Sequence, residues 1–197
     1  MSNWDYATTV PTETWRSATT IPRELQLKHV GNNILIASQP VKELNKIQAK
    51  SKLVDNIKAA KNLDLASVAG KITFPCRINI NLEQANDFSF RLSNRMGDEL
   101  LIGFDKKNTQ YYIDRSRSGK TDFNKDFAAR HVAPRFVKGK MNVSLVIDVS
   151  SVELFADDGL SVMTEIFFPN KPYDQLHLKS GGGIKKLEYV RMESIWQ

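Results

Sequence analysis

The chain has 197 residues, of which 41% are hydrophobic and 25% charged, a balance typical of one large globular domain or of one domain with an appended piece of another. Much of the formal net charge of +6 comes from residues 41–61, where six lysines oppose only Glu43 and Asp55. That segment lacks the arginine and aromatic residues that nucleic-acid binding favours, and no apolar run approaches the roughly 20 residues of a membrane span, so we expect neither partner.

The amino-terminal stretch, residues 1–30, is rich in turn-forming residues and predicts little regular structure. The pair Asn32-Asn33 then precedes the apolar run 34–37. An apolar run of this length after a turn signal predicts a short strand, which Pro40 would end because proline cannot donate to a strand ladder.

Residues 41–57 place apolar side chains at helical spacing. The apolar positions are Val41, Leu44, Ile47, Val54 and Ile57. This spacing predicts a helix over 41–57, and it is the only helix that the pattern of the chain predicts.

After Gly70 the sequence changes to the alternation of apolar and polar residues that is typical of strands. The predicted strands are 72–82, 88–92, 100–104, 110–113, 143–149, 152–155, 161–168, 175–178 and 184–195. Short strands separated by turns at this interval are typical of two packed sheets. The predicted fold class is all-β, an antiparallel, jelly-roll-like β-sandwich.

Two of the turns are strong hairpin signals. Asp105-Lys106-Lys107-Asn108 separates two alternating segments, and Asp157-Asp158-Gly159 separates two more. Asp157 and Asp158 are adjacent carboxylates, but at the corner of a hairpin we expect them to be solvated and to diverge, not to form a catalytic pair.

The reactive side chains give no catalytic or metal-binding pattern. Cys76 lies in an alternating segment, which favours a buried structural thiol over a nucleophile. The histidines His29, His131 and His177 are widely separated, and none has a neighbour at metal-ligand spacing. We expect no metal and no cofactor.

Several polar and aromatic residues have structural interpretations. Arg23 and Glu24 are adjacent, which is consistent with a buried ion pair, with a hydrogen-bond network or with simple support of a strand. The carboxylate of Asp114 is expected to accept backbone N–H bonds and so to order the turn that follows it. The pairs Tyr111-Tyr112 and Phe167-Phe168 are expected to place one ring of each pair in the core and the other on the opposite face.

Three stretches, spread in order along the chain, carry a family resemblance. The first is Met1-Ser2-Asn3-Trp4 with Ile21-Pro22-Arg23-Glu24-Leu25, similar to W-M-S-N-W…L-P-R-E-L. The second is Tyr112–Gly119, similar to Y-V-D-R-T-x-S-G, and the third is Val152–Gly159, similar to V-E-x-F-x-D-D-G. Together they resemble glycoside hydrolase family 32, the fructan-cleaving levanases, inulinases and invertases.

The resemblance implies a five-bladed catalytic β-propeller followed by a β-sandwich. In that scheme residues 1–39 are a remnant of the last propeller blade, residues 40–55 are a linker with room for a short helix, and residues 56–197 are the sandwich. The family places its nucleophile aspartate in W-M-N-D-P-N-G, a second aspartate in R-D-P and its acid/base glutamate in E-C. None of these motifs occurs in this sequence.

The missing carboxylates decide what the chain can do alone. A retaining glycosidase needs two carboxyl groups about 5 Å apart, one to attack the anomeric carbon and one to protonate the leaving oxygen. We therefore assign no catalytic residue to this chain and expect it to be inactive by itself.

By the same resemblance, Trp4 lies where the propeller contributes aromatic surface to the rim of the sugar pocket. Aromatic rings suit that role because they pack against the C–H groups of a sugar face. Packing within the blade is an equal alternative for Trp4. Asn3 is a further candidate, because its amide can bond to sugar hydroxyls.

These observations leave three hypotheses. The first is the carboxyl-terminal portion of a fructan-hydrolysing enzyme, with the catalytic propeller as its partner and fructan or sucrose-type carbohydrate as the parent's substrate. The second is a non-catalytic carbohydrate-binding module, which needs an aromatic platform or a groove of planar polar side chains. The third, an anionic polymer bound by the lysine segment, is the least favoured. The sequence assigns no location, although the resemblance favours a secreted or periplasmic parent.

Overall fold

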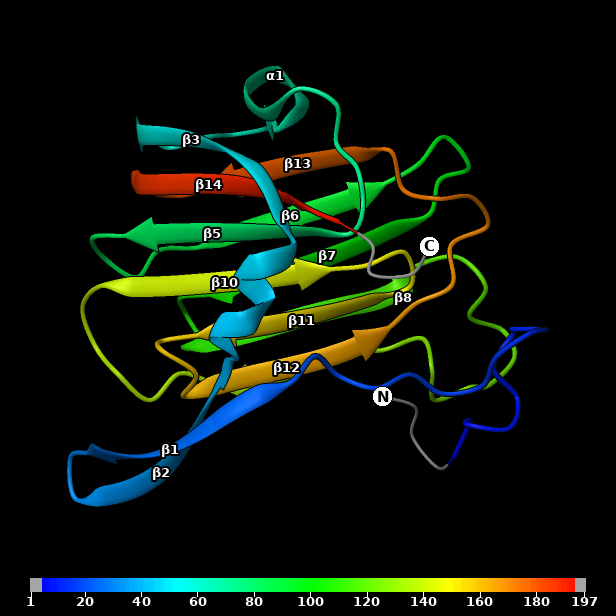
Figure 1. Ribbon diagram of the computed structural model, residues 1–197, viewed down its shortest axis with the longest axis horizontal. Coiled ribbons are helices and arrows are strands. Elements are labelled where there is room, and N and C mark those ends of the chain that lie inside the picture. Colours follow the sequence, from blue (N-terminus) through cyan, green and yellow to red (C-terminus); the bar gives the residue numbers. More distant parts are fainter. Residues whose placement is uncertain (1–4, 194–197) are drawn as a thin grey trace.

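The structure is a computed structural model that describes residues 5–193, apart from the side chain of Lys50. Two six-stranded sheets stack face to face, and a two-stranded hairpin extends beyond the edge strand β12 (Figure 1). Every strand pair is antiparallel. The predicted antiparallel β-sandwich is therefore confirmed.

The first sheet has the strand order β12-β11-β10-β5-β14-β3. Its strands are β3 (Gln48–Ile57), β5 (Cys76–Leu82), β10 (Met141–Ile147), β11 (Ser151–Ala156), β12 (Ser161–Ile166) and β14 (Ile184–Met192). Strands β10, β11 and β12 are joined by tight turns, and β5 and β14 insert beside them at the centre.

The second sheet lies behind the first in Figure 1 and has the order β4-β13-β6-β7-β8-β9. Its strands are β4 (Leu63–Asp64), β6 (Phe88–Ser93), β7 (Glu99–Asp105), β8 (Gln110–Arg117), β9 (Arg130–Pro134) and β13 (Gln175–Ser180). The elements outside both sheets are the hairpin β1 (Arg23–Val30) and β2 (Asn33–Pro40), the 3-10 helix η1 (Lys42–Ile47) and the one-turn helix α1 (Ala66–Ala69).

The main core lies between the two sheets. Alternate residues of β5 point inward, so Ile78 and Ile80 are almost completely buried while the residues between them are not. Phe90 and Leu92 of β6 face them from the second sheet. Cys76 is part of the same core, so its predicted burial is confirmed.

Two smaller apolar clusters fix the amino-terminal segment to the sandwich. Tyr6 and Val10 pack with Phe127 and Phe168 in one of them. In the other, Ile21 and residues of η1 cover Val146, Phe155 and Met192, which belong to the first sheet. The segment before β3 is therefore part of the folded body and not a free arm.

The helix predicted over 41–57 is wrong beyond Ile47. Only Lys42–Ile47 is helical, and Val41 supplies no side-chain cap. Residues 48–57 form β3, which pairs with β14 and sets Val54 opposite Leu187. The ladder to β14 and the cover that it gives Val54 and Ile57 outweigh a weak helical pattern, a case of tertiary contacts overriding local propensity.

Besides β3, three strands were not predicted from the sequence. β1 lies in the stretch that was expected to be turn-rich, β4 has two residues and β9 has five. Strand β9 is an edge strand with a half-exposed pattern and ends at a proline, so its apolar alternation is weak. These segments become strands because a neighbouring strand offers them a ladder.

Candidate functional site

The two site residues proposed from the sequence, Asn3 and Trp4, lie outside the described residues 5–193. The chain that follows them is held firmly. The Tyr6 side chain is buried, and its ring meets the Phe127 ring edge-on with centroids 5.3 Å apart. Trp15, a second tryptophan of the amino-terminal segment, is 37% exposed and lies beside Phe168 with ring centroids 6.3 Å apart.

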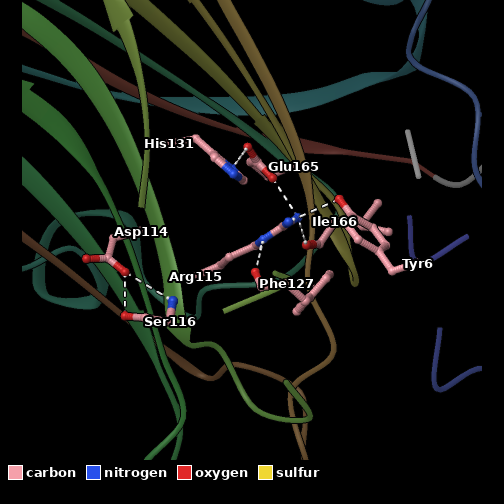
Figure 2. Close-up of polar contacts among 8 residues, drawn as sticks. All are labelled: Tyr6, Asp114, Arg115, Ser116, Phe127, His131, Glu165 and Ile166. Atoms are coloured by element: carbon pink, nitrogen blue, oxygen red, sulfur yellow. Dashed lines mark hydrogen bonds and ion pairs between the residues drawn. The ribbon is translucent and has the colours of Figure 1, made fainter. Parts of the chain in front are cut away.

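Arg115 is the centre of a buried polar network that holds Tyr6 (Figure 2). Its Nη1 donates to Glu165 Oε2 at 2.7 Å, its Nη2 donates to the Tyr6 hydroxyl at 3.0 Å, and its Nε donates to the Phe127 carbonyl at 2.7 Å. Its guanidinium carbon also lies 4.0 Å from the centroid of the Phe127 ring. One guanidinium thus joins the amino-terminal segment, β8 and β12.

The other oxygen of Glu165 is also bonded. His131 Nδ1 lies 2.6 Å from Glu165 Oε1, so both carboxylate oxygens have partners. Asp114, next to Arg115, accepts the backbone N–H of Ser116 at 3.0 Å and its hydroxyl at 2.6 Å (Figure 2). The predicted backbone bond to the Asp114 carboxylate is therefore confirmed, although Ser116 still belongs to β8 and the turn begins after Arg117.

Arg23 joins the start of β1 to the first sheet. It bonds to Glu153, and its Nη2 also donates to the Thr164 hydroxyl at 2.7 Å. Glu153 Oε1 accepts the Ile21 backbone N–H at 2.8 Å. Of the predicted alternatives, an ion pair of Arg23 with Glu24 does not form, because Glu24 points to Gln26 and the partner of Arg23 comes from β11.

The hairpin turn after β11 forms as predicted, but Asp157 is not solvated. All three residues of the turn have positive φ, including 49° at Asp157. The Asp157 carboxylate is buried, accepts the Arg135 Nε–H at 2.9 Å and accepts the Tyr111 hydroxyl at 2.7 Å. The expectation fails because the turn folds back against Arg135, so only Asp158 is exposed.

None of these groups is arranged for nucleophilic or acid–base catalysis. Glu153, Asp157 and Glu165 are each bound by an arginine. Burial raises the pKa of the Cys76 thiol far above its ordinary value, which disfavours a thiolate. Within residues 5–193, no three histidine, cysteine, aspartate or glutamate side chains gather in a way that would hold a metal ion.

One face of the β1–β2 hairpin is apolar and open to solvent. Leu27 pairs with Ile36, and the same face carries Leu25 and Ile34. These four side chains are between 60% and 74% exposed. The opposite face is attached to the body, because Ala37 is buried and Lys28 Nζ donates to the Asp158 carbonyl at 3.0 Å.

A second open feature is a cleft of about 470 Å³ between the end of β2 with η1 and the outer face of β5 and β10. Its walls carry five amide side chains beside the charged Lys42, Arg77 and Asp158, with an apolar portion at Pro40 and Val41. The amide residues are Gln39, Asn45, Asn79, Asn81 and Asn142.

The sequence carries signals for the buried network in the alternation of β8 and β12. In β8, Arg115 follows Tyr111 and Ile113 at alternate positions, so a strand must turn all three to the same side. In β12, Glu165 follows Met163 in the same way. A charged residue at an inward position requires a partner, which makes Arg115 and Glu165 a predictable pair.

The chain was compared with known proteins. Residues 40–197 match the sequence profile described as "Glycosyl hydrolases family 32 C terminal". The chain is 35% identical to the levanase of Bacillus subtilis (strain 168), with 100% of this chain and 30% of the levanase covered. It is 31% identical to the extracellular exo-inulinase of Aspergillus niger, with 93% of this chain and 35% of the inulinase covered.

The crystal structure of exo-inulinase from Aspergillus awamori superposes on the fold with a TM-score of 0.83 at 25% sequence identity. The match covers 100% of this chain and 40% of the inulinase. The chain therefore spans less than half the length of these relatives. On the profile match over residues 40–197 and these similarities, the chain belongs to glycosyl hydrolase family 32 and comprises its C-terminal domain.

Proposed function

We propose that the chain is the C-terminal portion of a fructan-hydrolysing enzyme of the levanase or inulinase type and that it packs against the catalytic propeller of that enzyme. The proposal is supported by relatives named levanase and exo-inulinase, of which the chain covers 30% and 35%. In this scheme residues 1–39 complete the last blade. The sandwich begins with β3 at Gln48, within the segment 40–55 that was expected to be a linker.

The observation that carries the proposal is the apolar face of the β1–β2 hairpin. Apolar side chains gathered on one face of a two-stranded ribbon favour a partner surface, because burying each one is worth on the order of 1–2 kcal/mol. Leu27 and Ile36, directly opposite each other, would form the centre of this contact. The occupant that fits is the remaining part of the parent enzyme, since the relatives extend well beyond the matched region.

The chain alone has no hydrolytic role in this proposal. Fructose release needs a nucleophile and an acid close together, and the buried carboxylates of the sandwich are held by arginines instead. The substrate of the parent, fructan or a sucrose-type sugar, would be bound and cut in the propeller. The sandwich supports that active site by holding one face of the hairpin and the segment around Tyr6 in place.

The test uses the purified chain with levan, inulin and sucrose, followed by mixing with the catalytic portion of the Bacillus subtilis levanase. We expect no fructose release by the chain alone and a stable complex with the catalytic portion. The double substitution Leu27→Asp and Ile36→Asp should abolish the complex. Leu53→Asp on edge strand β3, where the side chain is 50% exposed, is the matched control and should leave it intact.

Fructose release by the chain alone would contradict the proposal. So would a catalytic portion that binds neither the unaltered chain nor its control variant.

A further inference from the structure

The outer face of the first sheet carries asparagines at positions where strand propensity disfavours them. Asn79 and Asn81 lie on β5 and Asn142 lies on β10, the two strands at the centre of the sheet. Asn81 and Asn142 are directly opposite each other. Asparagine is depleted in strands, so three of them on adjacent central strands conflict with the local preference and indicate a function for the amides.

These amides line the cleft of about 470 Å³ described above. Residues 39–45 form its other wall, where Gln39 and Asn45 add two further amides. Pro40 and Val41 give that wall an apolar portion. The cleft thus combines planar polar groups with a small apolar surface, the arrangement typical of a small-molecule site.

The central amides keep unused hydrogen-bonding capacity. Asn81 Nδ2 donates to Asn142 Oδ1 at 2.6 Å, and Asn79 Nδ2 donates to Glu188 Oε2 at 3.0 Å. Within residues 5–193, the Asn79 and Asn81 side-chain oxygens and the Asn142 side-chain nitrogen have no protein partner. Two acceptor oxygens and one amide nitrogen, which can donate two N–H groups, are therefore available on neighbouring strands that line the cleft.

The charges around the cleft offset each other and so do not favour an ionic ligand. Lys42 and Arg77 are opposed by Asp158 in the lining and by Glu188, which accepts from Asn79 beside it. Arg77 Nη1 is also bonded to Asn45 Oδ1 at 3.1 Å. Sugar hydroxyls both donate and accept, which matches a row of amides better than a phosphate or carboxylate would. We propose that this cleft binds a neutral oligosaccharide, as a non-catalytic site on the sandwich.

The experiment is a titration of the isotopically labelled chain, followed by nuclear magnetic resonance. The probes are a levan-type fructo-oligosaccharide, an inulin-type fructo-oligosaccharide and a malto-oligosaccharide. Inorganic phosphate is titrated separately as an ionic comparison. The choice of fructans as probes rests on the proposed function, whereas the proposed site rests only on the amides that line the cleft. We expect the side-chain amide signals of Asn79, Asn81 and Asn142 to shift with at least one probe.

Asn142→Ala should weaken that binding about tenfold, the loss expected when hydrogen bonds to one amide are removed. Its side chain is exposed, so the fold should be retained, and the dispersion of the spectrum checks this. Gln84→Ala is the matched control, because Gln84 is an exposed amide on the turn after β5 and outside this cleft. It should bind like the unaltered chain.

Shifts with fructans alone or with all three sugars both support the site and define its selectivity. The proposal fails if no probe shifts these signals, if Asn142→Ala binds as tightly as the unaltered chain, or if inorganic phosphate is the better ligand. The titration needs no catalytic portion, so its failure would leave the packing role untouched. A failed reconstitution would equally leave this site untouched.

Discussion

Leu178 in β13 and Leu27 in β1 are the same residue on the same kind of element, yet they are 0% and 74% exposed. Leu178 lies between two six-stranded sheets that cover each other. Leu27 lies on a two-stranded ribbon whose apolar face no described residue covers. The sandwich completes its own core, whereas the hairpin carries apolar surface for which residues 5–193 supply no cover.

The polar contacts of the sandwich are also more complete than those of the β1–β2 hairpin. In the sandwich, buried charged side chains have bonding partners, as Arg115 with Glu165 and Arg135 with Asp157. The hairpin is attached at its base through Arg23 and along one face through Lys28, while its other face makes no such contact among the described residues. The difference indicates that the sandwich has a complete core of its own, whereas the hairpin has an apolar face that needs a partner surface.

The largest expected effect comes from the core. Leu178→Ala should lower the free energy of unfolding by about 2–5 kcal/mol, because it leaves a cavity between sheets that cannot collapse fully. Urea denaturation followed by tryptophan fluorescence measures this. A loss below about 1 kcal/mol would mean that the two sheets pack less tightly than their burial indicates.

The Arg115 network should have the next largest effect. Arg115→Met removes the cation that pairs Glu165 and frees the Tyr6 hydroxyl. Because His131 still bonds the other carboxylate oxygen, we expect a loss of about 1–3 kcal/mol, below that of a fully unpaired buried charge. Denaturation of this variant measures the loss. Adding Glu165→Gln should recover part of the stability, because the unpaired charge is then gone.

If the single and double variants were equally unstable, packing of the arginine against Phe127 would outweigh the ion pair. Limited proteolysis near Tyr6 is the second measurement. The amino-terminal segment should be cut faster in Arg115→Met than in the unaltered chain.

The contrast between core and hairpin also explains what the sequence could reveal. Alternation in β5 and β6 predicts both strands and their inward residues. A strand with one buried and one more exposed face has apolar residues at every second position, so its burial can be recognised from the sequence. Strand β3 (Gln48–Ile57) lacks this alternation of apolar and polar residues. Its conformation depends on β14, more than a hundred residues later, so local spacing over 41–57 indicated a helix.

The features of the candidate site also divide into those that local sequence reveals and those that depend on residues distant in the chain. The missing catalytic motifs can be read directly, since an absent motif needs no three-dimensional information. The Asp157 contact with Arg135 and the cleft between residues 39–45 and β5 need the folded arrangement, because they join residues distant in the chain. Nothing in the hairpin-turn sequence distinguishes the buried Asp157 from the exposed Asp158.

The smallest expected effect tests the hairpin directly. Leu27→Ala in this chain should change the free energy of unfolding by less than about 0.5 kcal/mol, because a side chain that is 74% exposed loses little burial. Leu178→Ala makes the same chemical change at a buried position, so the two variants can be compared directly.

The same Leu27→Ala substitution should weaken association with the catalytic portion of the levanase by about tenfold, as expected when an apolar anchor is shortened at an interface. A large loss of stability in the chain alone would show that the hairpin packs on its own sandwich, and the inferred role of its apolar face would then be wrong.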